Sequence, residues 1–179
     1  MNFPKPYADA VAKLRVPFGF ILVAAFLWFS APTWTSLEVG LPVSFAGLAL
    51  RAWAAGHLEK NLALATSGPY AHVRNPLYLG TLTAAAGFAI AARRWELAVL
   101  LAVVFLLVYL PAVELEEQHL RSLFDDYADY ARRVPKFVPR LGGKSSKHFQ
   151  WFLYRRNREY EAFAAFLAGV VVLLWKAAK

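Results

Sequence analysis

The 179-residue sequence contains no cysteine, and this absence excludes several kinds of chemistry. Without cysteine the chain has no disulfide bonds, no thiolate nucleophile and no metal site built on sulfur ligands. Charged residues are also scarce: they make up 18% of the chain, whereas ordinary soluble domains carry about 25%. Apolar residues reach 59%, above the ~45–50% that is usual for soluble proteins. This balance favours a membrane protein.

Several common catalytic motifs are missing as well. The sequence has no Gly-x-Ser-x-Gly nucleophile elbow, no Walker loop and no His-Glu-x-x-His zinc motif. It also lacks a strand, glycine-rich turn and helix in succession, so a nucleotide-like ligand cannot be held in the Rossmann manner. Glu116-x-x-His119 has the spacing of half a carboxylate-bridged metal site, but such sites use a second copy, which is absent. We therefore expect no bound metal.

Apolar runs recur along the chain, and a membrane-spanning helix needs about 20 predominantly apolar residues. The runs are 17–34, 39–50, 77–92, 97–113 and 162–175. Five such helices leave too little polar sequence to cover them in water. The sequence therefore predicts an all-α, polytopic membrane protein with about five transmembrane helices. We interpret the first run as a span rather than a cleavable signal peptide, because it is long and Pro32-Thr33-Trp34 is a poor cleavage site.

Breaking residues divide the chain into expected elements. The expected helices are 16–35, 38–58, 77–92, 95–113 and 148–176, preceded by an interfacial arm at 1–15. Gly68-Pro69 and Asn75-Pro76 predict a non-helical connection over 60–76. Beyond residue 113 the pattern becomes amphipathic, so we expect the fourth helix to continue into the cytosol until Pro135 and Pro139 end it. The segment GGKSSKH is expected to be a flexible linker before the last helix.

The formal net charge of +8 is unevenly distributed. Lys and Arg cluster in the N-terminal arm and in 114–160, which holds ten of the twenty, whereas 31–37 holds none. Because cytoplasmic loops are enriched in Lys and Arg, we expect the N-terminus, 57–76 and 114–160 to face the cytoplasm. Arg93 and Arg94 count against this orientation. Basic residues beside a membrane attract anionic headgroups, so we expect a lipid partner and no nucleic acid.

Two polar segments beside the apolar runs are candidates for a functional site. The first, SGPYAHVRNPLYLG at 67–80, is stiffened by its prolines and presents Tyr70, His72, Arg74 and Tyr78. Arginine binds carboxylate or phosphate bidentately, and tyrosine offers a π face and a hydroxyl. Interfacial anchoring of these side chains is the alternative that composition leaves open.

The second segment places Glu114, Glu116 and Glu117 where an apolar helix leaves the bilayer. Three neighbouring carboxylates repel one another, so we expect cationic partners, for which Arg74 and Arg51 are available. Arg51 lies inside an apolar run, where a charge indicates either function or a side chain that reaches toward the interface. A solvated acidic helix end is the alternative for the glutamates.

Together the two segments resemble the isoprenylcysteine carboxyl methyltransferase and phospholipid methyltransferase superfamily. SGPYAHVRNPLYLG follows the family pattern Gly-Pro-Tyr-x-x-Val-Arg-His-Pro-x-Tyr-x-Gly, and EEQHLRSLFDDYADYARRVP follows its Glu-Glu segment with two tyrosines before Arg-Val-Pro. The resemblance covers 51–139 of a single expected domain, 1–179, to which the helix at 148–176 is an addition. Family members are integral membrane enzymes that use S-adenosylmethionine.

The resemblance implies a cofactor pocket at the cytosolic face. The implied cofactor contacts are Tyr70, His72, Val73, Arg74, Asn75, Pro76, Tyr78, Glu116 and Glu117. Arg74 suits the carboxylate of S-adenosylmethionine, the Glu pair its ammonium or ribose, and the tyrosines its adenine or sulfonium. Arg74 and Glu116 are the implied catalytic residues, whereas Arg51, His57 and Tyr127 are the implied acceptor contacts.

The acceptor stays open. Carboxyl O-methylation of a prenylated cysteine needs a nearby cation such as Arg51, whereas N-methylation of a phospholipid amine needs a base, for which His57, His72 or a Glu is a candidate. A non-catalytic lipid-binding scaffold is a rival of another class. The last helix lies outside the matched region and is the expected surface of a homodimer.

The sequence departs from the family pattern at two positions. Asn75 stands where relatives carry His, and it cannot act as a cation or a base. The glycine that follows the motif phenylalanine is missing after Phe124, which predicts a continuous helix where relatives kink.

Overall fold

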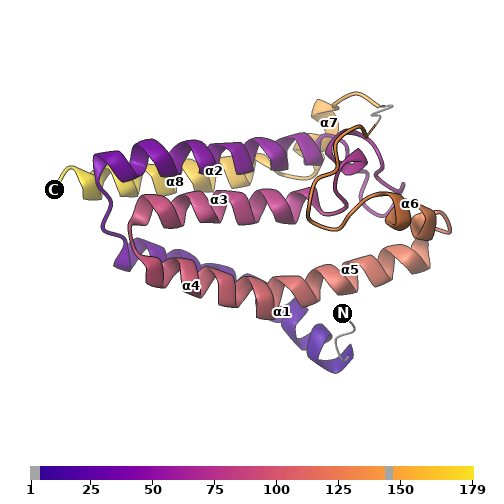
Figure 1. Cartoon of the computed structure of the whole chain (residues 1–179), viewed down its shortest axis with the longest axis horizontal. Coiled ribbons are helices and arrows are strands. Elements are labelled where there is room, and N and C mark those ends of the chain that lie inside the picture. The colour runs from indigo at the N-terminus through magenta and orange to yellow at the C-terminus, as the bar shows by residue number, and fades with distance from the viewer. Residues whose placement is uncertain (1–4, 144–146) are drawn as a thin grey trace.

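The computed structural model describes residues 5–143 and 147–179, and every regular element in those ranges is helical. The helices are α1 Lys5–Phe29, α2 Trp34–Ala55, α3 Pro76–Ala92, α4 Trp95–Val104, α5 Leu110–Leu123, α6 Tyr127–Arg133, α7 Trp151–Arg156 and α8 Tyr160–Ala177. A short 3-10 helix, Gly68–Ala71, lies between α2 and α3, and a π-helical turn, Phe105–Tyr109, joins α4 to α5. In Figure 1, α2, α3 and α8 run alongside one another, and α1 packs with the long α4–α5 rod.

Helices α2 and α3 approach each other closely because glycines line their contact. A Cβ added at Gly47 would collide with the backbone of Ala84 and Gly80, and one at Gly87 would collide with Ser44. Ser44 Oγ also donates a hydrogen bond to the Ala84 carbonyl oxygen at 2.8 Å. Small residues permit this backbone-to-backbone packing between membrane helices. The pair is therefore a rigid support for the loop that connects it.

The fourth apolar run continues through the π-helical turn as one rod, Trp95–Leu123, which confirms the expected extension of this helix. Pro111 lies inside the rod and has no N–H to donate, which leaves a carbonyl of the preceding turn without its helical partner. The Tyr7 hydroxyl donates to the Leu107 carbonyl oxygen at 2.8 Å. This contact from α1 supplies the hydrogen bond that the proline omits.

The rod ends at Leu123, so the expected continuation to Pro135 is wrong. Phe124 adopts an extended backbone with φ −130° and ψ 116°, and its N–H makes the last helical bond to Leu120. The following aspartates form a turn, a conformation that Asp favours, and Tyr127 N–H bonds back to Phe124 before α6 begins. The prediction of an unbroken helix in place of the missing glycine is therefore also wrong.

Other helix boundaries differ from those expected. The described part of the arm belongs to α1, which ends at Phe29 instead of residue 35. Helix α2 begins at Trp34 rather than 38, because Thr33 and Ser36 form a capping box there, and it ends at Ala55. Helix α3 confirms the expected 77–92 to within a residue. Residues 144–146 of the expected linker lie outside the described residues.

The expected helix 148–176 is broken into α7 and α8. Arg158 has φ +55°, a left-handed conformation that interrupts the helix. The preceding Asn157 is held in place, since its side-chain amide donates to the carbonyl oxygens of Ala55 and Leu58, each at 2.9 Å. The end of α2 thus fixes the start of α8.

The far end of α8 is attached to α1. Lys176 Nζ donates to the carbonyl oxygens of Ser30 at 2.8 Å and Trp28 at 3.2 Å, and it also contacts Ser30 Oγ at 3.0 Å. Helix carbonyls at a C-terminus have no intrahelical partner and attract a cation. Lys176 therefore caps α1 from a helix that is distant in sequence.

Within the described residues, two helices are long and apolar enough to cross a membrane by length and composition: Trp95–Leu123 and Tyr160–Ala177. Val16–Phe29 and Pro76–Ala92 are shorter apolar helices. Helix α8 is largely exposed along its apolar length, unlike the core helix of a soluble protein.

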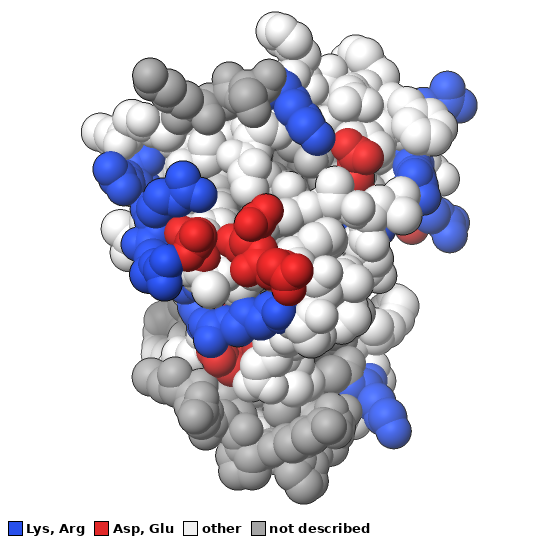
Figure 2. Space-filling view, turned by 90° about the vertical axis from the view of Figure 1, so that its right-hand side faces the viewer, with Lys and Arg blue, Asp and Glu red and all other residues white. Residues whose placement is uncertain are grey.

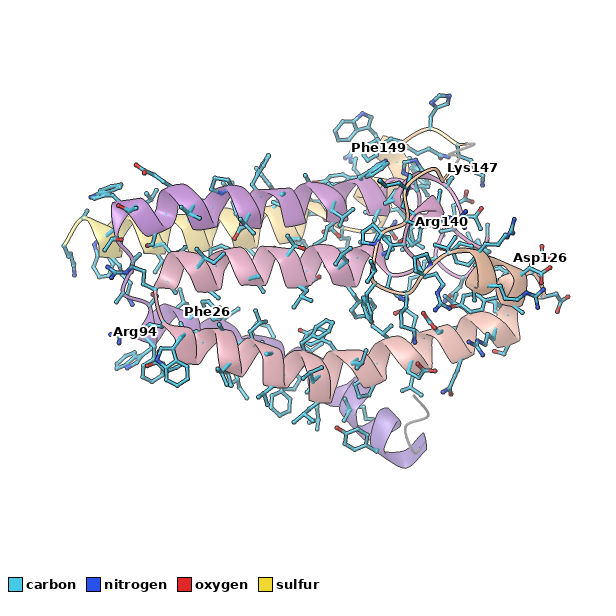
Figure 3. All side chains as sticks on the ribbon, viewed as in Figure 1. Phe26, Arg94, Asp126, Arg140, Lys147 and Phe149 are labelled. Carbon is cyan, nitrogen blue, oxygen red and sulfur yellow. The ribbon has the colours of Figure 1, made fainter. Side chains whose placement is uncertain are left out.

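Exposed tryptophans gather at the molecular end where α1 finishes, α2 and α4 begin, and α8 finishes. They are Trp28, Trp34, Trp95 and Trp175, and Trp28 is 81% exposed. Figure 3 labels Phe26 and Arg94 at this same end. Tryptophan is enriched where a membrane meets water, so this end has the composition of an interface.

Replacement of Gly47 by Val should destabilise the α2–α3 pair by about 1–3 kcal/mol, because the added atoms meet backbone that cannot move away. Thermal unfolding in detergent micelles measures the effect. Gly19→Ala is the matched control, since its Cβ would lie at an ordinary 3.6 Å from the Tyr109 hydroxyl. Equal melting temperatures for Gly47→Val and wild type would contradict the close-packing interpretation.

Candidate functional site

The loop between α2 and α3 is shaped by special backbone positions. Gly68 has φ +58°, and a Cβ there would strike the ring of His57, so only glycine fits. The chain then makes its 3-10 turn through Pro69, and Pro76 occupies the first turn of α3, where its missing N–H costs nothing. Val73 is 2% exposed, so it anchors the loop from inside.

A distant segment, 135–140, fastens this loop by backbone hydrogen bonds. Arg74 N–H donates to the Pro135 carbonyl oxygen at 2.9 Å, and Arg140 N–H donates to that of His72 at 2.9 Å. His72 Nδ1 also lies 2.8 Å from the Arg140 carbonyl oxygen. Figure 3 shows Arg140 at the opposite end of the molecule from Phe26 and Arg94. The two segments of the sequence pattern therefore meet in space.

The Glu117 carboxylate lies at the centre of this junction and is 2% exposed. Its Oε2 is 3.3 Å from Arg74 Nη1 and 3.2 Å from Lys136 Nζ, and its Oε1 accepts a hydrogen bond from Asn75 Nδ2 at 2.9 Å. Lys136 Nζ also contacts Glu114 Oε2 at 2.7 Å. Two cations and an amide thus compensate the buried charge, as a buried carboxylate requires.

These contacts confirm Arg74 as a partner of the acidic segment. Asn75 stands where the family pattern quoted above has His. Its neutral amide donates to Glu117, and a second contact reaches the Lys136 carbonyl oxygen at 3.4 Å. The three residues Arg74, Asn75 and Lys136 hold one carboxylate between two segments. Figure 2 looks onto this end of the molecule and shows acidic side chains bordered by Lys and Arg.

Glu116, the preceding residue of α5, points to a different side of the helix and is exposed. Its Oε2 accepts a hydrogen bond from the Tyr78 hydroxyl at 2.9 Å. The Tyr78 ring meets that of Tyr109 edge to face, with 6.5 Å between centroids. The neighbouring glutamates therefore differ in kind: Glu117 is enclosed and compensated, whereas Glu116 offers an accessible carboxylate beside two aromatic rings.

Two buried polar atoms beside Glu117 lack a hydrogen-bond partner among the described residues: Arg74 Nε and the Tyr127 hydroxyl. Tyr127 is 1% exposed, and burial raises the pKa of its hydroxyl to about 12, with the charge of Glu117 acting in the same direction. Buried donors without partners are rare and costly. The Tyr127 hydroxyl lies beside the Arg74 guanidinium, whose positive charge acts on its pKa in the opposite direction.

Burial likewise raises the pKa of Tyr70 and of Tyr130 well above the usual tyrosine range. The negative charges of Glu116 and Glu159 both add to the effect on Tyr70. The Tyr130 hydroxyl donates to the Tyr70 carbonyl oxygen at 2.8 Å, so it fastens α6 to the loop. These tyrosines are neutral hydroxyl donors at physiological pH.

Arg51 does not join the acidic segment, so that expected pairing is wrong. Its Nε lies 2.6 Å from Glu159 Oε1 and its Nη2 lies 3.0 Å from Glu159 Oε2, a bidentate ion pair. Its Nη1 contacts the Thr81 hydroxyl and, at 3.4 Å, the Leu77 carbonyl oxygen. Lys136 occupies the position beside the glutamates that Arg51 was expected to take.

His57 is buried under the loop, with ring nitrogens near the carbonyl oxygens of Trp53 at 2.9 Å and Lys147 at 3.3 Å. Its ring supports Gly68. Among the described residues, no three His, Asp or Glu side chains are grouped as metal ligands.

Sequence reasoning missed Lys136, Tyr109 and Glu159. Lys136 directly follows the Arg-Val-Pro segment in the sequence. This place, after the glutamates of the same motif, was the one available signal that it could pair with them. Glu159 precedes the last apolar run, where a carboxylate beside a span needs a partner. The site as a whole offers an accessible carboxylate, two aromatic rings and two unsatisfied buried donors within one loop–helix junction.

Comparison with known proteins shows which sequences this chain is similar to. A sequence model described as phospholipid methyltransferase matches residues 14–127. The chain is 37% identical over 154 residues to a protein named cobalt-zinc-cadmium resistance protein CzcN from Cupriavidus metallidurans, covering 80% of this chain and 71% of that relative. It is 38% identical over 117 residues to nickel-cobalt-cadmium resistance protein NccN from Alcaligenes xylosoxydans xylosoxydans, covering 64% of this chain and 53%, about half, of that relative. No solved structure matches the chain.

Glu117→Gln should destabilise the protein by about 3–5 kcal/mol, because Arg74 and Lys136 would keep their charges without the buried counter-charge. Glu116→Gln, one residue away and exposed, should change stability by no more than about 0.5 kcal/mol. Chemical unfolding of both variants in detergent compares them. If Glu117→Gln unfolds no earlier than Glu116→Gln, the junction does not depend on Glu117.

Tyr127→Phe tests the raised pKa of the buried hydroxyl. The folded state holds this proton more tightly than the unfolded chain, so the stabilising contribution is complete below pH 10 and is lost as the pH rises to about 12. The stability of wild type should therefore fall over that interval, and that of Tyr127→Phe should fall less steeply. Parallel slopes in alkaline unfolding curves would contradict the assignment.

Proposed function

The chain belongs to the phospholipid methyltransferase family, and from this premise we propose that it transfers a methyl group from S-adenosylmethionine to a lipid-like acceptor reached from the bilayer. The observation that carries the proposal is the pair of unsatisfied buried donors, Arg74 Nε and the Tyr127 hydroxyl, beside the loop that bears the family pattern. Their combination with the accessible Glu116 complements a ligand that carries both a carboxylate and cationic groups.

The available donors and acceptors fit S-adenosylmethionine. Arg74 Nε and the Tyr127 hydroxyl would hold its carboxylate, since both are donors without another partner among the described residues. Glu116 would take the ammonium or the ribose hydroxyls, because its carboxylate is exposed. Tyr78 and Tyr109 offer ring faces and edges to the adenine or the sulfonium.

The bound cofactor supplies an activated methyl group on a positively charged sulfur, so the protein has little covalent chemistry to perform. Arg74 and Glu116 would fix the ligand at two points, which orients the methyl group toward the acceptor. The apolar faces of α3 and the rod exclude water from the bilayer side of the loop. We propose that positioning and desolvation supply most of the rate enhancement.

Of the two acceptor classes, the amine has the better structural support. Carboxyl O-methylation needs a cation for the acceptor, and the leading candidate, Arg51, is committed to Glu159 on two atoms. N-methylation needs a base. Both ring nitrogens of His57 lie against backbone carbonyl oxygens, whereas only Nδ1 of His72 does. A proton on that Nδ1 leaves Nε2 of His72 with its lone pair, so His72 is the candidate base and Glu116 stays with the cofactor.

We also propose how the protein lies in the membrane. Five apolar helices would span it, with the N-terminus and the loop–helix junction in the cytoplasm, as the distribution of Lys and Arg predicts. The single domain would carry its catalytic core at 51–139. The outward face of α8 is the proposed contact for a homodimer, since its apolar residues are exposed.

The names of the two relatives refer to metal resistance. We propose that this chain would contribute to such a process through the membrane lipid. The support is its family.

Calorimetric titration with S-adenosylhomocysteine tests cofactor binding. Wild type in lipid nanodiscs should bind, and Glu116→Ala should lose binding because the carboxylate that faces the ligand is removed. Arg74→Ala should lose it too, although this change also disturbs Glu117. Glu96→Ala is the matched control, since Glu96 is an exposed glutamate in the first turn of α4, at the other end of the rod.

Absence of binding to wild type in both detergent and lipid would reject the enzyme proposal. Binding without methyl transfer from labelled cofactor to any extracted lipid or prenylcysteine analogue would support the non-catalytic scaffold instead. Mass spectrometry of the labelled lipids identifies the acceptor and separates O- from N-methylation.

A further inference from the structure

Helix α7, Trp151–Arg156, is fastened to the end of α2 by one of its sides. Just before it, Gln150 N–H donates to the Gly56 carbonyl oxygen at 2.9 Å. The Phe149 ring covers Gly56, where an added Cβ would come within 2.2 Å of it. Leu153, on the inner side of α7, is 3% exposed. These contacts hold α7 in one orientation, so its outer side is a defined surface.

The outer side of α7 carries two large aromatic side chains. Trp151 is 71% exposed and Phe152 is 68% exposed. The Trp151 ring is held in place, because it meets the rings of Phe149 and Tyr154 edge to face, with 5.0 Å and 5.7 Å between centroids. Exposed apolar rings are unfavourable in water, and aromatic residues are enriched where a membrane meets water. This side of α7 therefore has the composition of a membrane interface.

Two arginines share the outer side with the rings. Arg155 lies four residues, about one helical turn, beyond Trp151. Arg156 has the same relation to Phe152, so each arginine and its ring are surface neighbours, about 5–6 Å apart at Cβ. Both arginines are exposed, and neither has an acidic partner among the described residues. The next two acidic residues in the sequence are already paired with other arginines. Two positive charges thus stay uncompensated beside two exposed rings.

Helix α8 sets the level of this surface relative to the membrane. It is apolar enough to cross a bilayer, and its 18 residues span about 27 Å, close to the ~30 Å of the hydrocarbon core. It begins at Tyr160, four residues after α7 ends, and Trp175 of the tryptophan end lies near its finish. Figure 1 shows α7 at the end of α8 opposite the C-terminus. When the tryptophan end lies at one interface, α7 lies at the other.

We propose that the outer side of α7 is a docking site for an anionic phospholipid, with the phosphate held by Arg155–Arg156 and the glycerol and first methylene groups against Trp151 and Phe152. Guanidinium groups bind a phosphate bidentately. Two uncompensated positive charges favour a head group of net negative charge over a zwitterionic one. A free phosphate ion would leave the rings in water, so the lipid fits the surface as a whole.

This lipid is not the methyl acceptor. The segment that binds it lies beyond the residues 14–127 that the family model matches. Its binding depends on the membrane position proposed above and is independent of methyl transfer. Because α7 is fastened to the end of α2, a bound head group would hold the loop–helix junction against the bilayer.

Two dioleoyl lipids that differ in the head group test this site: phosphatidylglycerol, which is anionic, and phosphatidylcholine, which is zwitterionic. Each is titrated into the purified full-length protein in maltoside micelles, and the melting temperature is followed, since a ligand of the folded state raises it. Phosphatidylglycerol should raise it at a lower lipid-to-protein ratio than phosphatidylcholine. Arg155→Gln combined with Arg156→Gln should lower the apparent affinity for phosphatidylglycerol about tenfold or more.

Arg132→Gln combined with Arg133→Gln is the matched control. It also removes two exposed arginine charges, but from α6, where Asp129 already contacts both side chains. This variant should respond to phosphatidylglycerol as wild type does. Trp151→Ala keeps both arginines of α7 and should lower the apparent affinity about threefold or more, because the lipid loses its apolar contact.

Equal responses of wild type to the two lipids, or an unchanged response of the α7 arginine variant, would overturn the proposal. An equal loss in the α6 variant would show a general charge effect and would also overturn it. Inorganic phosphate alone should leave the melting temperature unchanged; a rise as large as that with the lipid would assign the site to a soluble anion instead. Self-association in light scattering that Trp151→Ala abolishes would assign the surface to a second copy of the chain.

Titration of the same samples with S-adenosylhomocysteine separates this result from the proposed function. Selective binding of phosphatidylglycerol without cofactor binding would keep the docking site and reject the enzyme. Cofactor binding without selective lipid binding would keep the enzyme and reject the docking site.

Discussion

The buried carboxylate of Glu117 is the constraint on which the functional end of the molecule depends. A charge that is 2% exposed must be compensated, and its partners come from the α2–α3 loop, as Arg74 and Asn75, and from the segment after α6, as Lys136. The backbone bonds between His72 and Arg140 follow from the same arrangement. The electrostatic requirement of a single side chain thus brings together parts of the chain that are far apart in sequence.

The glycine contact between α2 and α3 gives this junction a rigid base. Close backbone packing fixes the distance between the end of α2 and the start of α3, so the loop that spans them has little freedom. Gly68 then rests on the His57 ring, and Pro76 begins α3 without losing a hydrogen bond. The loop is therefore stiffened by the His57 ring beneath Gly68 as well as by its prolines.

Local signals in the sequence predicted the all-helical architecture, the bounds of α3 and the extension of the fourth run, because glycine, proline and long apolar runs act on their own neighbourhood. The pairing of Arg74 with the glutamates was also predicted. The sequence did not identify the partner of Arg51, because Glu159 is 108 residues away in the chain. The break between α7 and α8 is what brings the Glu159 carboxylate to Arg51. The break at Phe124 was missed for a similar reason: a turn of two aspartates ends the helix, although the residue that usually marks the kink is absent.

Both ends of α8 are attached to other helices, through Asn157 and Glu159 at its start and through Lys176 at its finish. A helix of 18 residues is about 27 Å long. A free helix adapts to a thinner or thicker bilayer by changing its tilt, but one that is held at two points cannot do so without breaking a bond. Helix α8 is therefore held at a fixed tilt relative to α1 and α2, so it cannot adjust on its own to a bilayer of different thickness.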